Sequence, residues 1–157
     1  MASTPVGLSA DERATCERIA GICPSASLKK TSRAVSRYFD DALQPVGLRS
    51  GQLVMLMTIA VLERPTYGQL ARDLVMDSST IARSLRPLER DGLIELVSGP
   101  DRRRKSVQIT ADGLDRIRTA MPHWERAQQH FLGQVGSKTW DSVLKGLAAT
   151  LTGTKGL

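Results

Sequence analysis

Residues 66–110 constrain the fold of this chain more than any other segment. They predict a short polar helix, a tight turn, a second helix over about residues 78–91, and two strands joined by a loop. In the second helix Ile81, Leu85 and Leu88 recur at spacings of four and three, so they share one apolar stripe. The other side of this helix carries hydroxyl and guanidinium groups, from Ser79, Thr80, Arg83 and Arg86. One face of this helix is therefore expected to pack against a hydrophobic core, and the other presents polar groups to solvent or to a ligand.

The loop between the two strands is strongly basic. Residues 101–105 read Asp-Arg-Arg-Arg-Lys, four cations in five residues, and follow Gly99-Pro100. A helix with short polar side chains near its start, followed by a cationic hairpin, suits duplex DNA, because the helix fits the major groove and arginines reach phosphates or the minor groove. The predicted DNA contacts are Ser78, Ser79, Thr80, Arg83, Arg86, Arg102, Arg103, Arg104 and Lys105.

These contacts divide by role. We expect Ser79, Thr80 and Arg83 to reach base edges, whereas Arg86 and the loop cations suit phosphates. The alternative is a helix face that is merely solvated and a basic loop that serves only solubility. A run of cations this dense without balancing acids favours DNA.

Composition sets wider limits. The chain has 157 residues, 41% hydrophobic and 4% aromatic, so stacking platforms for single-stranded nucleic acid are not expected. Its formal net charge is +6, which favours a polyanionic partner. The sequence has no apolar run of the ~18 residues that span a bilayer and no signal-peptide core, which predicts a cytoplasmic protein without a membrane partner. The sequence shows neither a nucleophile with a base placed beside it nor a glycine loop that could hold a phosphate, so an enzyme is not expected. No cofactor is predicted.

Helical periodicity extends on both sides of this region. The predicted helices cover about residues 25–43, 49–62, 67–74, 78–91, 111–132 and 137–151, and the strands cover 93–97 and 105–109. Pro87 and Pro122 fall inside two of these helices, where they predict bends. The helix at 49–62 is apolar on most faces, so we expect it to be the buried centre. The terminal helices carry more apolar surface than the central domain can cover, which predicts pairing with a second copy of the chain.

Six fragments occur in an order and spacing that are specific together, although each is weak alone. They are Leu43-Gln44-Pro45-Val46-Gly47-Leu48, Gly68-Gln69-Leu70-Ala71, Ser79-Thr80-Ile81-Ala82-Arg83-Ser84-Leu85, Leu88-Glu89-Arg90-Asp91-Gly92-Leu93-Ile94, Asp101-Arg102-Arg103, and Val107-Gln108-Ile109-Thr110-Ala111-Asp112-Gly113. Over about residues 25–150 the chain resembles the MarR family of bacterial winged-helix regulators.

The resemblance implies a mainly α fold with a small β-hairpin wing. Residues 1–45 would form an N-terminal arm and dimerisation helix, residues 46–110 a winged helix-turn-helix DNA-binding domain, and residues 111–157 the C-terminal dimerisation helices. It also implies a homodimeric repressor on a palindromic operator, with half-sites one helical turn apart, and release by a small, often aromatic effector. In the family's wing an Asp stands two residues before an Arg, so Asp101 would orient Arg103.

Two alternatives stay open at this stage. Cys16 and Cys23 would serve an oxidant-sensing repressor, although ordinary small apolar residues are the simpler interpretation. Within one intact helix their spacing of seven residues corresponds to ~10.5 Å, too far for a disulfide bond. The second alternative is a DNA-binding protein that has no effector. His123 and His130 have no further ligands at metal-binding spacing, so no metal site is predicted.

Overall fold

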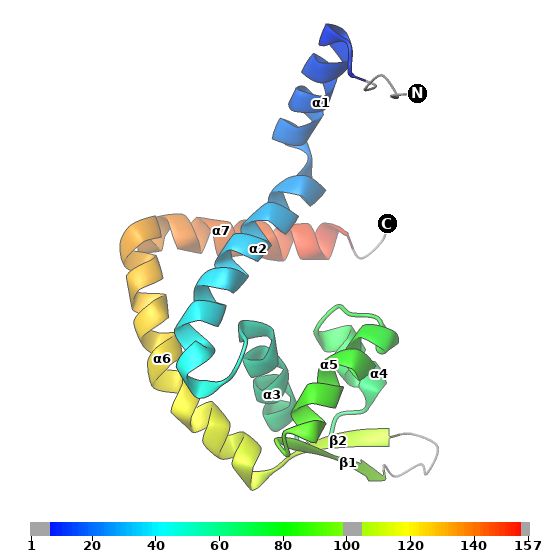
Figure 1. The fold of residues 1–157 in the computed structure, drawn as a ribbon, viewed down its shortest axis with the longest axis vertical. Coiled ribbons are helices and arrows are strands. Elements are labelled where there is room, and N and C mark those ends of the chain that lie inside the picture. Colours follow the sequence, from blue (N-terminus) through cyan, green and yellow to red (C-terminus); the bar gives the residue numbers. More distant parts are fainter. Residues whose placement is uncertain (1–6, 99–104, 155–157) are drawn as a thin grey trace, which may run out of the picture. The chain divides into compact units, whose positions relative to one another are not determined.

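The computed structural model describes residues 7–98 and 105–154 (Figure 1). Its elements are α1 (Ala10–Ile22), α2 (Pro24–Leu43), a 3-10 helix η1 (Gln44–Val46), α3 (Ser50–Leu62), α4 (Tyr67–Asp73), α5 (Ser78–Arg90), β1 (Ile94–Ser98), β2 (Lys105–Ile109), α6 (Ala111–Val135) and α7 (Ser137–Gly153). The expected fold class, mainly helical with one two-stranded hairpin, is confirmed. Contacts divide the chain into two compact units, one ending at Tyr38 and one beginning at Phe39.

The first unit contains α1, a helix that the sequence analysis did not include. It begins at a capping box in which the Ser9 amide donates to the Glu12 carboxylate over 2.8 Å and the Glu12 amide donates to Ser9 Oγ over 3.3 Å. The bond from the Ser9 amide, and then a bond of 2.8 Å from Ser9 Oγ to the same carboxylate, lower the pKa of Glu12. The helix ends at Ile22, Cys23 is its C-terminal cap, and Pro24 begins α2. Cys16 and Cys23 therefore do not share one helix, and the spacing expected for an intact helix does not apply to them.

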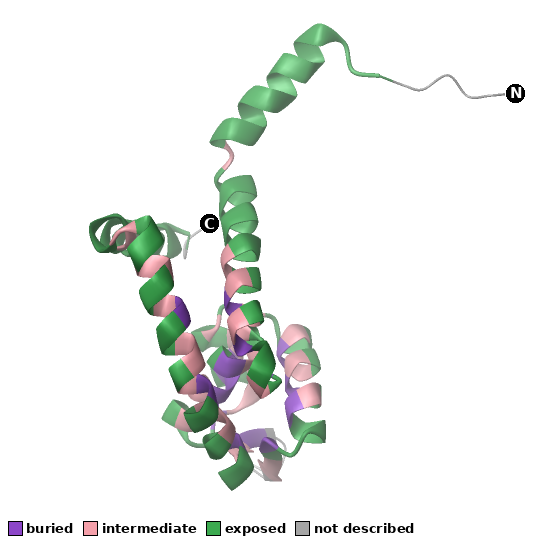
Figure 2. Cartoon of the chain, turned by 60° about the vertical axis from the view of Figure 1, so that its left-hand side comes forward, coloured by how far each residue is buried: buried purple, intermediate pink, exposed green. Residues whose placement is uncertain are grey.

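The second unit is built around the apolar side chains of α3, α4, α5 and the hairpin (Figure 2). The predicted stripe of α5 is confirmed, because Ile81, Leu85 and Leu88 are at most 1% exposed. Burying a side chain of this size stabilises a fold by roughly 1.5–3 kcal/mol. The core also includes Leu43, Leu53, Leu56, Ile59, Leu70 and Val107.

Helix α3 is only partly the buried centre that its composition predicts. Leu53, Leu56 and Ile59 are buried, but Val54 is 46% exposed and Val61 is 80% exposed. An all-round apolar helix is normally covered on every side. One face of α3 therefore lies uncovered in the single chain.

The hairpin is anchored to the helix-turn-helix. β1 and β2 pair antiparallel, with Ile94 opposite Ile109. A bridge between Thr66 and Ser106, and a hydrogen bond of 2.9 Å from the Val107 amide to the Pro65 carbonyl, add the segment before α4 to the edge of β2. β1 begins one residue later than predicted.

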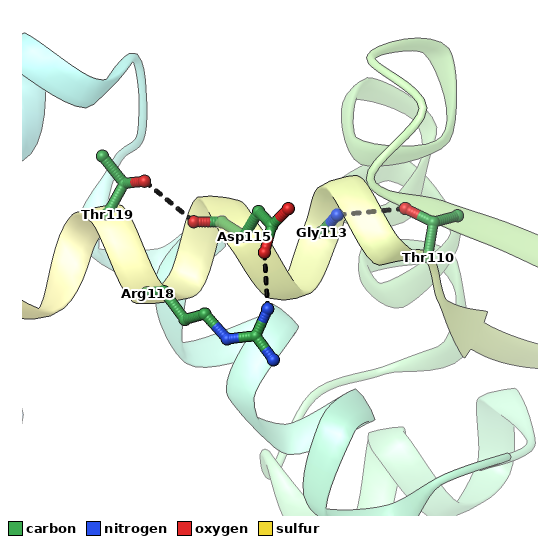
Figure 3. A network of polar contacts seen from close by, with 5 residues as sticks. All are labelled: Thr110, Gly113, Asp115, Arg118 and Thr119. Carbon is green, nitrogen blue, oxygen red and sulfur yellow. Dashed lines mark hydrogen bonds and ion pairs between the residues drawn. The ribbon is translucent and has the colours of Figure 1, made fainter.

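That later start follows from Leu93, which connects three elements. Its amide donates to the Leu88 carbonyl at the end of α5 over 2.9 Å, and its carbonyl accepts from the Thr110 amide over 3.1 Å. The Thr110 hydroxyl donates to the Gly92 carbonyl over 2.7 Å and accepts from the Gly113 amide over 3.0 Å, which caps α6 (Figure 3). The base of the wing is thus closed by backbone and side-chain bonds.

Gly113 is required by close packing at this junction. It is buried, and a Cβ at this position would lie 2.1 Å from the Leu93 carbonyl oxygen and 2.7 Å from Ile109 Cγ1. Farther along α6, Arg118 pairs with Asp115 and the Thr119 hydroxyl donates to the Asp115 carbonyl, all on the exposed side (Figure 3). Both α5 and α6 continue through their internal prolines, and α6 and α7 end three and two residues later than predicted.

Candidate nucleic-acid interface

Helix α5 begins with a carboxylate that holds the first polar side chains in place. Asp77 Oδ1 accepts from the Thr80 amide over 2.8 Å and from Ser79 Oγ over 2.5 Å, and Asp77 Oδ2 accepts from Thr80 Oγ1 over 2.6 Å. The bonds from the two hydroxyls, and then that from the amide, hold the pKa of Asp77 far below its usual range. Asp77 is therefore a carboxylate at any physiological pH.

The predicted base-reading and phosphate-binding residues of α5 lie together on its outer side. Ser78, Ser79, Arg83 and Arg86 are exposed, and Thr80 is half-buried. The Arg83 guanidinium turns back along the helix, with Nε 3.4 Å from the Ser79 carbonyl oxygen and Nη2 3.5 Å from Ser79 Oγ. These distances exceed those of strong hydrogen bonds, so little holds Arg83 in this position.

Arg86 lies near the first helix of the pair. Burial raises the pKa of the Tyr67 hydroxyl, the negative charge of Glu89 raises it further, and the positive charge of Arg86 opposes both. Tyr67 packs on the apolar core. The guanidinium of Arg86 thus lies within electrostatic range of α4, the neighbouring helix.

The wing is described only at its base. Asp101, Arg102, Arg103 and Arg104 lie outside the described residues, so their predicted roles stay predictions. Lys105 is the first residue of β2, opposite Ser98.

One further cation lies at the wing's edge, and the sequence analysis did not select it. Arg64 is exposed, and its Nε donates to Gln108 Oε1 on β2 over 2.8 Å. Its partner lies 44 residues away along the chain, so no local pattern indicates this bond.

The cysteines and histidines do not assemble into a site in the described parts of the chain. Cys16 is exposed, Cys23 is half-buried, and both are free thiols. Residues 7–98 and 105–154 contain no group of three or more His, Cys, Asp or Glu side chains placed to hold a metal ion. A redox role for the two cysteines stays a prediction.

The uncovered face of α3 borders an open hollow of about 250 Å³. Its lining is mainly apolar, with one hydroxyl and one carboxylate: Val54, Met57, Thr58, Val61, Leu62 and Asp73. In the described segments no single helix is long and apolar enough to cross a bilayer. One pair of consecutive segments, Pro24–Val46 and Ser50–Leu62, has the length and composition of a span when taken together, but it is bent by 76°.

The helix-turn-helix and the strands beside it are matched by a sequence model of the MarR family, over residues 48–106. Over this segment the chain is similar to the MarR family. The resemblance inferred from the six fragments is confirmed, and this is a family of winged-helix DNA-binding transcriptional regulators, not of enzymes.

A curated transcriptional regulator is similar to part of this chain. An uncharacterized HTH-type transcriptional regulator of Bacillus subtilis (strain 168), YwoH, is 25% identical over 85 residues, which is 54% of this chain and 62% of that protein. The chain thus matches less than two thirds of the length of this curated relative.

Solved MarR-type structures cover more of the chain. The M. tuberculosis transcriptional regulator MosR, in complex with DNA, is 28% identical with a TM-score of 0.77, covering 85% of this chain and 97% of that one. A mutant of E. coli MarR complexed with operator DNA is 20% identical with a TM-score of 0.76, covering 85% of this chain and 97% of that one, and it shares the fold.

Proposed function

We propose that this protein is a homodimeric, sequence-specific DNA-binding transcriptional regulator, a repressor that a small apolar effector releases from a palindromic operator. The observation that carries the DNA-binding part is the outer side of α5, where Ser79, Thr80, Arg83 and Arg86 gather over a fully buried apolar stripe. A helix of this kind enters the major groove with its first turns toward the bases. The structure of MosR, at 28% identity, contains DNA.

The wing completes the proposed interface. The strands that carry residues 101–104 are joined through Pro65 and Val107 to the start of α4, so the basic loop departs from a fixed base. Arginines in this loop would neutralise phosphates or enter the minor groove, with Asp101 orienting Arg103. Arg64, held on Gln108, adds a cation at the same edge.

Apolar surface on the C-terminal helices supports the homodimer. Helix α7 exposes four large apolar side chains at spacings of one, three and four: Val143, Leu144, Leu147 and Leu151, each 39–48% exposed. A contiguous apolar stripe that is exposed to water in the single chain marks a protein–protein contact. We assign residues 111–157 and 1–45 to this contact and residues 46–110 to DNA.

Dimer geometry then sets the form of the operator. Two α5 helices related by a two-fold axis fit half-sites ~34–36 Å apart, so the operator is an imperfect palindrome. The hollow beside α3, with Met57 in its lining, suits a small apolar ligand. A ligand acts as an inducer when it binds better to a dimer whose recognition helices no longer match DNA.

Footprinting on the DNA around its own coding sequence, with the molar mass measured by light scattering, tests this proposal. We expect a dimer and two protected half-sites about one helical turn apart. A monomer, or protection without a two-fold repeat, contradicts the DNA-binding part. A thermal-shift panel of aromatic acids, phenols and acyl-CoA esters tests the effector part, which is wrong if no compound stabilises the protein or releases DNA. Release by peroxide that disappears when Cys16 and Cys23 are both replaced by Ser would favour the oxidant-sensing alternative.

A further inference from the structure

The carboxylate of Asp77 fixes which way the two hydroxyls at the start of α5 point their hydrogens. We propose that Asp77 turns Ser79 and Thr80 into hydrogen-bond acceptors toward DNA, so that the start of α5 selects, on the strand it contacts, a base with an amino group in the major groove: adenine, through N6, or cytosine, through N4. This inference rests on the proposed DNA-binding function and specifies what that interface reads.

The direction of these bonds follows from the chemistry of the acceptor. A carboxylate has no hydrogen, so in the contacts of 2.5 Å and 2.6 Å the Ser79 and Thr80 hydroxyls must be the donors. Each hydroxyl has one hydrogen and two lone pairs. With that hydrogen bound to Asp77, both side chains can only accept from a ligand.

Thr80 is the better placed of the two to accept. Ser79 Oγ also lies 3.5 Å from Arg83 Nη2, which competes for one of its lone pairs. In the described part of the chain Asp77 is the only partner found for Thr80 Oγ1. We therefore assign the amino-group contact first to Thr80.

This arrangement changes what a hydroxyl can bind in the major groove. A free Ser or Thr hydroxyl serves either base type, because it can donate or accept. With its hydrogen committed it cannot donate to guanine O6 and N7 or to thymine O4, which are acceptors. It also cannot donate to a phosphate, so these two side chains read bases, and the arginines bind the backbone.

The substitution Asp77→Asn removes the acceptor-only constraint on Thr80 with almost no change in shape. The amide oxygen can still accept from the Thr80 amide and from Ser79, and Asn is as good a helix N-cap as Asp. The amide nitrogen takes the place of Oδ2 and donates to Thr80 Oγ1, which frees the Thr80 hydrogen to point outward. D77N also removes a negative charge, but that effect strengthens binding to all sequences alike.

The experiment is selection from a duplex library with randomised half-sites, followed by affinities for single-base variants, using the full-length protein. We expect the wild type to prefer adenine or cytosine at one position of each half-site about fivefold, the effect of one hydrogen bond of about 1 kcal/mol. D77N should relax that preference, so that guanine and thymine bind about as well as adenine and cytosine at that position. Thr80→Val should abolish it, both alone and combined with D77N.

The outcomes separate this inference from the function on which it rests. If the wild type selects a palindrome but D77N and Thr80→Val keep the same base preference at every position, Asp77 does not set the readout, although the regulator assignment stands. If the wild type selects no sequence at all, both are wrong. Thr80→Val leaves the Asp77 cap on the Thr80 amide in place, so it tests the readout independently of D77N.

Discussion

Gly113→Ala gives the sharpest test of how the wing is joined to α6. The added methyl would lie 2.1 Å from the Leu93 carbonyl oxygen and 2.7 Å from Ile109 Cγ1. An ordinary contact begins near 3.4 Å, so α6 and the start of β1 would have to separate by more than 1 Å. The nearer atom belongs to the backbone, which cannot rotate away as the end of a side chain can.

The magnitude follows from opposing terms. Alanine is up to about 1 kcal/mol better than glycine in a helix, which favours the variant, but by less in the first turn, where Gly113 lies. Overpacking typically costs ~1–3 kcal/mol, and displacing the Leu93 carbonyl also weakens its bond from the Thr110 amide, about 1 kcal/mol. We expect a net loss of about 1–3 kcal/mol in the free energy of unfolding, or ~2–12 °C in Tm for a chain of this length.

The assay is thermal and urea unfolding followed by circular dichroism at one protein concentration, because the stability of a dimer depends on concentration. Gly51→Ala is the matched control, since a Cβ at Gly51 in α3 meets no atom within 4 Å. That variant should be neutral or slightly more stable. A Gly113→Ala protein as stable as the wild type would show that the wing and α6 are not in close contact.

Three further predictions concern DNA and assembly. Arg83→Ala should cost ~1–3 kcal/mol of discrimination at one base position in anisotropy titrations, whereas Arg118→Ala, which removes the same charge from the exposed side of α6, should leave base preference unchanged. Arg103→Ala should weaken binding to all sequences evenly and lower the slope of log affinity against log salt by about 1; a loss confined to one operator position would contradict a phosphate or groove role. Replacing both Leu144 and Leu147, 48% and 39% exposed, by Glu should convert the dimer to a monomer in light scattering and remove operator protection, and an unchanged molar mass would place the interface elsewhere.

The recognition helix could be predicted almost residue by residue because its signals are local. The apolar stripe at Ile81, Leu85 and Leu88 lies within this one helix. The observed helix, Ser78–Arg90, differs from the expected range by one residue.

Other features were missed for two different reasons. Helix α1 has a local signal, the pair Ser9 and Glu12 at the spacing of a capping box, which the sequence analysis did not use. The bonds from Arg64 to Gln108 and from Val107 to Pro65 join residues more than 40 positions apart, so only the folded chain brings them together.

The sequence analysis selected Ser79 and Thr80 but not the carboxylate of Asp77 that holds them. The sequence shows that hydroxyls are present, and only the coordinates of their oxygens show where the hydrogens must go. Residue type therefore predicted the location of the interface and left its polarity undetermined.

The bridge between Thr66 and Ser106 and the bond between Pro65 and Val107 limit how the wing can move. The strand pair cannot tilt away from the turn before α4 unless both links break. In a complex with a duplex, the distance between the hairpin and α5 would thus be fixed by the protein. New target sites would then evolve by exchange of side chains on α5 and the hairpin, and the distance between these two elements would stay the same.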